Sequence, residues 1–556
     1  MTLVLCEDDV IFEDHLFRNH VSRAQLAVLD AWREAAQAID VSFALFGPEV
    51  HLVVWAAPVS ATRLDALPLS VRLTDVHVYE RDSAESTDTF PKTLGTLRLC
   101  SPRMTRLPES VGQLTSLTTL NLRSCQLLTE LPESMGQLAA LTTLNLRNCE
   151  SLTGLPKSMG QITTLTTLDI SFCSLLTELP EWIGQLSALT TLKCWSCRSL
   201  TKLPESMGQL AALMTLNLDS CRTLTGLPVA MGQLTALTKL NLCGCELLTG
   251  LPESMGQLAA LRTLDLNGCK SLMGLPESMG QLAALVTLNL HRCDSLTGLP
   301  ESMNQLAALR TLDLRSCDSL TGLPVLMGQL AALTTLDLNY CISLTGLPES
   351  MGHLTALKTL VLGSCSSLTE LFASMGQLAA LRTLDLNYCI SLTELPESMG
   401  HLTALQTLDL GSCGSLTELP ESMGHLEALT TLSLHSCILL TRLPESMGQL
   451  AALTTLKLSS CSSLSKLPER MGQLAALTTL DLYSCISLTQ LPESLARFPN
   501  SLRLDVSFCN LMFPPQHVAE NGICAIRAFF LACANGTLAL QHDRLMLLGD
   551  GGAGKT

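Results

Sequence analysis

Four residues near the end of the chain have types and a spacing that can bind phosphate. The segment DRLMLLGDGGAGKT runs from a short apolar stretch into Gly549, Gly554, Lys555 and Thr556, in the pattern GxxxxGKT. In such a P-loop the backbone N–H groups surround the phosphates, the lysine contacts the terminal phosphates and the threonine hydroxyl binds Mg²⁺. The following helix and a Walker B carboxylate would lie beyond Thr556, so we expect no enzymatic activity from these residues and no cofactor.

Cysteine is the second residue type that could do chemistry, since the chain has 23 of them. Seventeen recur every 24 residues from Cys125 to Cys509, which favours a repeated structural role over a disulfide framework. Cys194 and Cys197 form a CxxC pair, but both fall on positions that the repeat buries, which favours a core role over a redox role. The histidines near the N-terminus are too irregular for a metal site. We therefore expect reduced thiols, no metal site and no catalytic residue.

The cysteines mark a repeating unit of 24 residues. In the unit Leu117–Ala140, LTTLNLRSCQLLTELPESMGQLAA, leucines stand at positions one, four, six, twelve and fifteen, and cysteine stands at position nine. Alternation around Leu120 predicts a short strand, and Pro132 ends it before a helical or 3₁₀ turn around Met135. A unit this short cannot bury its own leucines, so successive coils must stack around a shared core. The expected fold is an α/β solenoid with a concave parallel sheet and short helices or 3₁₀ turns on the convex side.

This unit resembles a known family. The pattern LxxLxLxxCxxLxxLPxxMGxL is similar to the leucine-rich repeat, in the cysteine-containing variant of cytoplasmic plant and protist members. The resemblance implies an arc that binds other proteins. The first unit departs from the pattern, because Pro102 stands where the cysteine is expected and the coil is one residue shorter, so it is predicted to be an edge coil. We assign the repeats to residues 91–512, about 18 coils.

The segment after the repeats has its own signature. The stretch PPQHVAENGICAIRAFFLACANG follows a PPxxVxxxGxxAIxxF pattern and resembles the segment after the repeats in the Roco family of GTPases. The resemblance implies that residues 541–556 begin a Roc-like domain and that a complete parent protein binds GTP and Mg²⁺. A full-length GTP-hydrolysing Roco protein and a repeat-only sensor of the immune type are the alternatives. From the residues themselves, 513–540 are expected to form a helical cap over the last coil, with Val518, Ile526, Phe529 and Phe530 as its apolar contacts.

Positions five and seven of the unit are expected to face out of the concave sheet. Position five places aspartates in adjacent coils, and stacked carboxylates repel each other unless a cation lies over them. Either these side chains bond to neighbouring threonines and water, or they form an acidic groove for a basic protein partner. Position seven varies most, which indicates either a recognition surface or neutral drift. The candidate partner-binding residues are Phe172, Lys193, Trp195, His291, Arg315, Asp313, Asp337, Tyr340, Asp385 and Asp409. Trp195 is the expected anchor, because exposed aromatic residues tend to dominate binding energy.

Residues 1–90 differ in composition from the repeats and are predicted to form a small α/β region or cap. Apolar residues from Leu26 to Ile39 recur every three or four positions, which predicts an amphipathic helix, and HLVVWA and SVRLTDVHVY are typical of strands. The net charge of −16 argues against nucleic-acid binding. With no secretory signal and no apolar run of membrane-spanning length, we expect a cytoplasmic protein that does not bind membranes.

Overall fold

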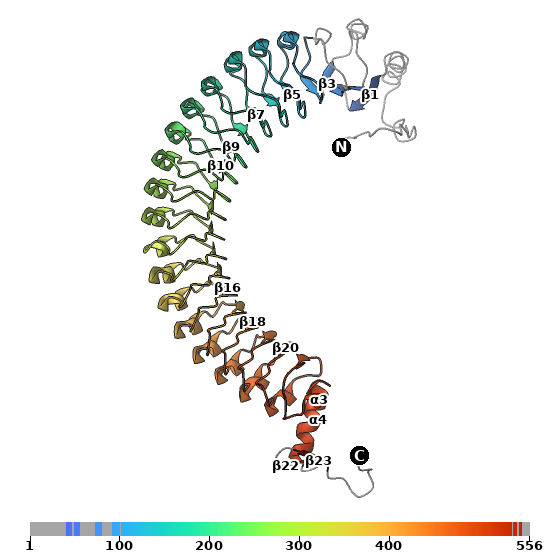
Figure 1. The fold of residues 1–556 in the computed structure, drawn as a ribbon, viewed down its shortest axis with the longest axis vertical. Helices are drawn as coiled ribbons and strands as arrows, with labels where there is room; N and C mark the ends of the chain where they lie inside the picture. The colour runs from blue at the N-terminus through green and yellow to red at the C-terminus, as the bar shows by residue number, and fades with distance from the viewer. Residues whose placement is uncertain are drawn as a thin grey trace. The chain divides into compact units, whose positions relative to one another are not determined.

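The computed structural model describes residues 92–100 and 102–535 in full, together with the backbone of the strands at 41–46, 49–55, 73–79, 538–541 and 544–547. The helix expected between Leu26 and Ile39 lies outside these residues. The chain divides into two compact units, Met1–Ser174 and Leu175–Thr556. In both units every coil carries a short strand on one side and a 3₁₀ helix on the other (Figure 1). The α/β repeat fold expected from the sequence is confirmed.

The first unit combines three strands of the N-terminal region with four repeat strands. Strand β1 pairs antiparallel with β2, and β2 to β7 follow in parallel pairs. The sequence predicted β2 and β3 but missed β1. The elements are β1 Val41–Phe46, β2 Glu49–Trp55, β3 Leu73–Tyr79, β4 Thr96–Leu99, η1 Glu109–Gln113, β5 Thr119–Asn121, η2 Glu133–Gln137, β6 Thr143–Asn145, η3 Lys157–Gln161 and β7 Thr167–Asp169.

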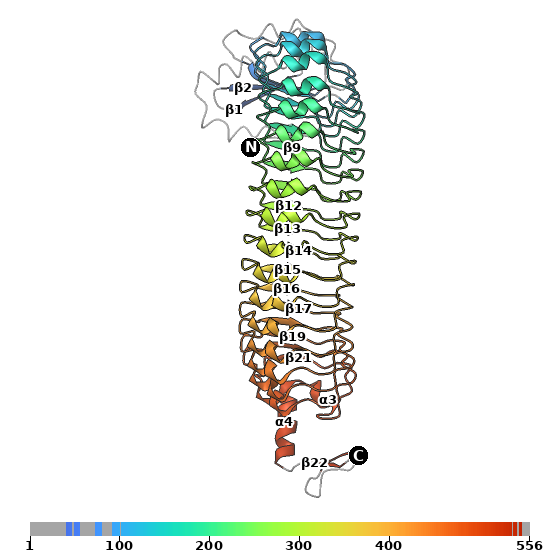
Figure 2. The same cartoon turned by 90° about the vertical axis from the view of Figure 1, so that its left-hand side faces the viewer.

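The second unit stacks the parallel strands β8 to β21 in register, so that equivalent residues of successive coils are neighbours. Figure 2 shows the 3₁₀ helices stacked in a column. The elements of the coils are η4 Glu181–Gln185, β8 Thr191–Lys193, η5 Glu205–Gln209, β9 Thr215–Asn217, η6 Val229–Gln233, β10 Lys239–Asn241, η7 Glu253–Gln257, β11 Thr263–Asp265, η8 Glu277–Gln281, β12 Thr287–Asn289, η9 Glu301–Gln305, β13 Thr311–Asp313, η10 Met327–Gln329, β14 Thr335–Asp337, η11 Glu349–His353, β15 Thr359–Val361, η12 Ala373–Gln377, β16 Thr383–Asp385, η13 Glu397–His401, β17 Thr407–Asp409, η14 Glu421–His425, β18 Thr431–Ser433, η15 Glu445–Gln449, β19 Thr455–Lys457, η16 Glu469–Gln473, β20 Thr479–Asp481, η17 Glu493–Arg497 and β21 Arg503–Asp505. The chain continues into α3 Gln516–Ala519, α4 Ile523–Ala534, β22 Leu538–Gln541 and β23 Arg544–Leu547.

The core consists of the leucines of each coil. Leu312 and Leu314, at positions four and six, are 0% exposed, as are Leu309 at position one and Leu320 at position twelve. Each of these side chains contributes roughly 1.5–3 kcal/mol by leaving water. Because the leucines recur in every coil, burial continues from one coil to the next.

The ladder cysteines bind neighbouring coils to each other. The Cys149 thiol donates to the carbonyl oxygen of Leu122 at 3.2 Å, and the Cys365 thiol donates to that of Leu338 at 3.2 Å, in each case in the preceding coil. Burial raises the pKa of the Cys341 thiol to about 12. The ladder thiols therefore serve as buried hydrogen-bond donors between coils, which is the core role that their period predicts.

Glutamate hydrogen bonds and close packing at glycine hold successive 3₁₀ helices together. Glu349 in η11 accepts hydrogen bonds from the backbone N–H groups of Ala373 at 2.8 Å and Ser374 at 3.0 Å, at the start of η12. Glu133 makes the same contact with Ser158 at 3.0 Å. Successive 3₁₀ helices approach so closely that a Cβ on Gly136 would lie 2.5 Å from the carbonyl oxygen of Ser158, so a larger residue there would force the two helices to shift.

The segment after the last coil packs on its end. The guanidinium of Arg527 in α4 donates to the carbonyl oxygens of Ala496 and Phe498 and to Oδ1 of Asn500. The ring of Phe513 contacts those of Phe529 and Phe530 edge-on, with centroids 5.3 and 5.4 Å apart. The sequence indicated the apolar contacts of this segment but not the role of Arg527.

Candidate functional site

The strand face presents the side chains of positions five and seven, and position five has a structural task. The Asp385 carboxylate accepts the backbone N–H of Asn387 at 2.9 Å, and Asn241 accepts that of Cys243 at 2.9 Å. The same bond, from position five to the N–H two residues later, is made by Asn121, Asn145, Asp169, Asn217, Asp265, Asn289, Asp313, Asp337, Asp409, Asp481 and Asp505. The sequence analysis considered bonds to threonine and water and missed this turn, although Asp and Asn favour it. Because both residue types make the bond, it does not require the negative charge of aspartate.

The register brings aspartates side by side. Asp313 lies opposite Asp337, Asp385 lies opposite Asp409, and Asp481 lies opposite Asp505. These are the adjacencies that the period predicts, at a strand spacing of about 4.8 Å.

An arginine partly compensates the charge of the first pair. The Arg315 guanidinium donates to Asp313 through Nε to Oδ1 at 3.0 Å and through Nη2 to Oδ2 at 2.7 Å, and its Nε lies 3.6 Å from Oδ2 of Asp337. These carboxylates raise the pKa of Arg315, chiefly through the hydrogen bonds with Asp313. Arg315 is thus held by its own chain, and its role in binding a partner stays a prediction.

The second pair is not compensated in this way. Within residues 92–100 and 102–535, no side chain forms an ion pair with Asp385 or Asp409. Burial raises the pKa of Asp385, and the adjacent carboxylate of Asp409 raises it further. Two neighbouring carboxylates of this kind repel each other unless a proton or a cation relieves the repulsion.

The side chains at position seven are less exposed than the sequence analysis expected. Ser171 is 2% exposed, and Cys243, His291 and Arg315 are half-buried. Burial lowers the pKa of His291, and Arg315 lowers it further, so this imidazole favours its neutral form. Tyr340, at position eight, is 55% exposed and has a φ of 62° in the turn after the strand.

The expected aromatic anchor, Trp195, lies in the second unit, and Phe172 lies in the first. Phe172 lies in the first unit, where the Arg147 guanidinium is 5.3 Å from its ring centroid. Trp195 is half-buried and Lys193 is exposed, and both belong to the second unit. The binding role of these three residues stays a prediction.

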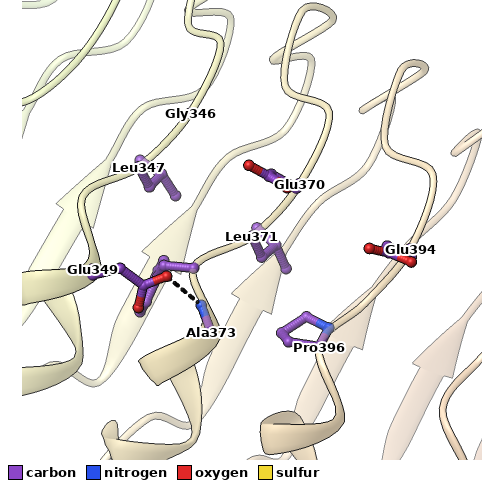
Figure 3. Close-up of a pocket in the computed structure, with 9 residues that line it drawn as sticks. Gly346, Leu347, Glu349, Glu370, Leu371, Ala373, Glu394 and Pro396 are labelled. Atoms are coloured by element: carbon purple, nitrogen blue, oxygen red, sulfur yellow. Dashed lines mark hydrogen bonds between the residues drawn. The ribbon is translucent and has the colours of Figure 1, made fainter.

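A shallow pocket of about 270 Å³ lies beside the 3₁₀ helices rather than on the strand face. It is lined from three successive coils by Gly346, Leu347, Glu349, Glu370, Leu371, Phe372, Ala373, Glu394 and Pro396 (Figure 3). Phe372 replaces the proline of the repeat and is 3% exposed. The carboxylate of Glu349 already accepts a hydrogen bond from the backbone amide of Ala373. The acidic groups of the pocket that remain exposed are therefore Glu370 and Glu394.

Other predicted features are located as follows. Gly549, Gly554, Lys555 and Thr556 lie outside the described residues. Across the described part of the chain, no group of histidine, cysteine, aspartate or glutamate side chains is arranged to hold a metal ion. The described helices include none that is long and apolar enough to cross a bilayer.

Comparison with known proteins bears on the repeats. Family models described as leucine-rich repeat region match residues 292–391 and 372–466, and models described as leucine rich repeat match 116–138, 164–186 and 236–258. No curated protein sequence matches the chain.

Solved structures share the fold. A leucine-rich-repeat protein of Leptospira interrogans is 27% identical, with a TM-score of 0.52 over 86% of this chain and 98% of that chain. Toll in the Toll–Spatzle complex of Drosophila is 17% identical, with a TM-score of 0.55 over 87% of this chain and 68% of that chain. The matching models, the stacked coils and these likenesses together show that the chain contains leucine-rich repeats and has the leucine-rich-repeat fold.

Proposed function

We propose that this chain recognises a protein partner through the strand face of its second unit, where a basic segment of the partner lies over Asp385 and Asp409. Protein recognition is the general role that leucine-rich repeats support. Toll, which is similar in fold, is likewise seen in a complex, with Spatzle. The observation that carries the proposal is the adjacency of these two carboxylates, which no cation of the described residues pairs with.

The structure offers a clean way to remove this charge. Asparagine at position five makes the same turn bond as aspartate, as Asn217 and Asn241 do. The double variant Asp385→Asn, Asp409→Asn should therefore keep the fold and lose two negative charges. We expect its affinity for a fluorescent Lys/Gly peptide of 20 residues to fall roughly thirtyfold at low salt, since each of the two lost charge contacts is worth on the order of 1 kcal/mol.

A matched control removes two charges elsewhere. Glu370→Gln with Glu394→Gln changes the net charge equally, but at the pocket beside the 3₁₀ helices. This control should bind the peptide as the unaltered chain does. Equal loss in both double variants would mean that the peptide responds only to overall charge, and the proposed site would be wrong.

We further propose that these repeats belong to a Roco-type GTPase. The proposal is supported by the order of the segments, with the PPxxVxxxGxxAIxxF stretch and then Gly549, Gly554, Lys555 and Thr556 following the last coil. The coding sequence beyond codon 556 tests it. An open frame with a Walker B aspartate and an Asn/Lys/Asp guanine-recognition motif is expected, and a stop codon would contradict the proposal.

A further inference from the structure

Position ten, in the turn after each strand, alternates in size through seven successive coils. The residues are, in order, Ile342, Ser366, Ile390, Gly414, Ile438, Ser462 and Ile486. The four isoleucines, named here the isoleucine ridges, are 44%, 51%, 50% and 50% exposed. The intervening small residues Ser366, Gly414 and Ser462, whose positions are named here the grooves, are all half-buried. In the coils from Cys125 to Cys317 the same position is polar throughout, so the alternation is confined to this stretch.

Neighbouring positions strengthen the alternation. Tyr340 and Tyr388, 55% and 53% exposed, stand beside the first two ridges, whereas the coil between them and the later coils of the stretch carry serine at the same position. A Cβ built on Gly414 would meet only Cγ1 of Ile438, at 3.9 Å, so this groove is open space next to a ridge. The turns of the second unit therefore form a corrugated apolar surface.

The pitch of this surface fits an α-helix. Ridges are two coils apart, about 10 Å at a strand spacing of about 4.8 Å. Residues seven apart on an α-helix are separated by about 10.5 Å and lie on nearly the same side. In an extended chain, residues three apart are separated by about 10 Å but point to opposite sides. A helix that lies along the stack can therefore place an apolar side chain in each groove, and a strand cannot.

The charge beside the ridges selects the partner. Asp337, Asp385 and Asp481 each precede a ridge isoleucine by five residues in the same coil, and Asp409 lies between two ridges. The other position-five residues of the stretch are Val361, Ser433 and Lys457, so four carboxylates outnumber one cation. A second copy of this chain would bring another row of aspartates against the first, which is unfavourable. A basic partner removes that repulsion.

We infer that the surface from Tyr340 to Ile486 docks a basic amphipathic α-helix of a partner protein. Apolar side chains at every seventh residue of this helix enter the grooves, and its lysines or arginines face the position-five aspartates. Six coil spacings separate Ile342 from Ile486, about 29 Å, which corresponds to roughly 20 helical residues or three heptads. The inference rests on the proposed function and specifies the form of the partner.

The test uses the full chain and a designed peptide. The probe is a fluorescent 24-residue helical peptide with a leucine at every seventh position and its remaining residues mainly lysine and alanine. A groove-filled variant carries Ser366→Ile, Gly414→Ile and Ser462→Ile, and a ridge-removed variant carries Ile390→Ser and Ile438→Ser. We expect fluorescence anisotropy to show at least a tenfold loss of affinity in both, although the first adds apolar surface and the second removes it.

The possible outcomes are distinct. Undiminished or tighter binding by the groove-filled variant would indicate general stickiness and overturn the inference. In a second outcome, only the double variant Asp385→Asn, Asp409→Asn loses binding, while the groove-filled and ridge-removed variants bind as the unaltered chain does. That result would support the proposed function and overturn the inference that a helix docks on the ridges. Equal binding of a peptide with the same residues in scrambled order would overturn it as well. If the chain without peptide forms dimers in sedimentation and the ridge-removed variant does not, the surface binds a second copy of the chain and the inference is overturned.

Discussion

At the scale of single residues, the turn hydrogen bond made by position five does not depend on the charge of the residue there. Aspartate and asparagine make the same bond to the N–H of position seven, so the fold accepts either residue. The charge of Asp385 and Asp409 is therefore available for recognition. The hydrogen bond and the negative charge of the position-five side chain can therefore be tested separately by matched substitutions.

Asp385→Asn should leave the stability nearly unchanged, whereas Asp385→Ala should lower the free energy of unfolding by about 1 kcal/mol. The reason is that alanine loses the 2.9 Å bond to the Asn387 N–H while asparagine keeps it. Urea denaturation of the two variants measures the difference. Equal destabilisation by both substitutions would show that the charge itself, and not the turn bond, stabilises the strand.

The thiols of Cys243 and Cys245 should react at different rates. Cys243 is half-buried at position seven, and burial together with Asp219 and Asp265 raises its pKa to about 11, whereas Cys245 is 0% exposed with a pKa raised to about 12. Because the thiolate is the reactive form, maleimide labelling should be slow at pH 7, faster at higher pH, and always earlier at Cys243. Mass spectrometry of the labelled peptides provides the order. Earlier labelling of Cys245 would place the strand register one residue out.

At the scale of elements, glutamates connect successive 3₁₀ helices. The backbone N–H groups of Ala373 and then Ser374 lower the pKa of Glu349 in the folded chain. A lowered pKa means that the carboxylate contributes stability above its unfolded pKa, near 4.5, and that this contribution disappears as pH falls through the folded value.

Glu349→Ala should therefore destabilise the chain by roughly 0.5–1 kcal/mol at pH 7, as loss of a helix cap does. The difference in Tm between this variant and the unaltered chain should shrink as pH falls below about 4.5. Glu349→Gln is the control, because its amide oxygen can still accept one of the two bonds. A difference in Tm that stays constant down to pH 3 would rule out the carboxylate as the source.

Much of each element was predictable from the sequence, but the side-chain hydrogen bonds between elements were harder to predict. The period and the leucine positions predict the strand, the 3₁₀ turn and the aspartate pairs, because these depend on spacing alone. The bonds of Glu349 to the next helix and of Arg315 to Asp313 depend on how far one coil is offset from the next and on the rotamers of long side chains, which spacing does not determine. Strand β1 was missed because its partner β2 supplies the pairing that makes VSFALF a strand.

At the scale of the whole molecule, stability is shared between neighbours. Each coil of the second unit contacts the coils before and after it through leucines, thiols and strand bonds, so a local defect should spread to adjacent coils. Leu312→Ala, at a fully buried position of β13, should cost about 2–5 kcal/mol.

Hydrogen exchange followed by mass spectrometry locates this loss. Amides of β13 and then of β12 and β14 should exchange faster, while those of β20 should change least. Val325→Ala, at a side chain of the same coil that is 67% exposed, is the control and should leave the profile nearly as it was. Uniform acceleration over all coils would show that the stack unfolds as one cooperative block.

The account depends most on the claim that Asp385 and Asp409 form a site for positive charge, and a charge exchange tests it most directly. Binding of a Lys/Gly peptide and of a Glu/Gly peptide is measured for the unaltered chain and for Asp385→Lys, Asp409→Lys, with circular dichroism as the check on folding. We predict that the unaltered chain prefers the lysine peptide and that the reversed variant loses it and gains the glutamate peptide. Unchanged preference for the lysine peptide in the folded variant would contradict the account.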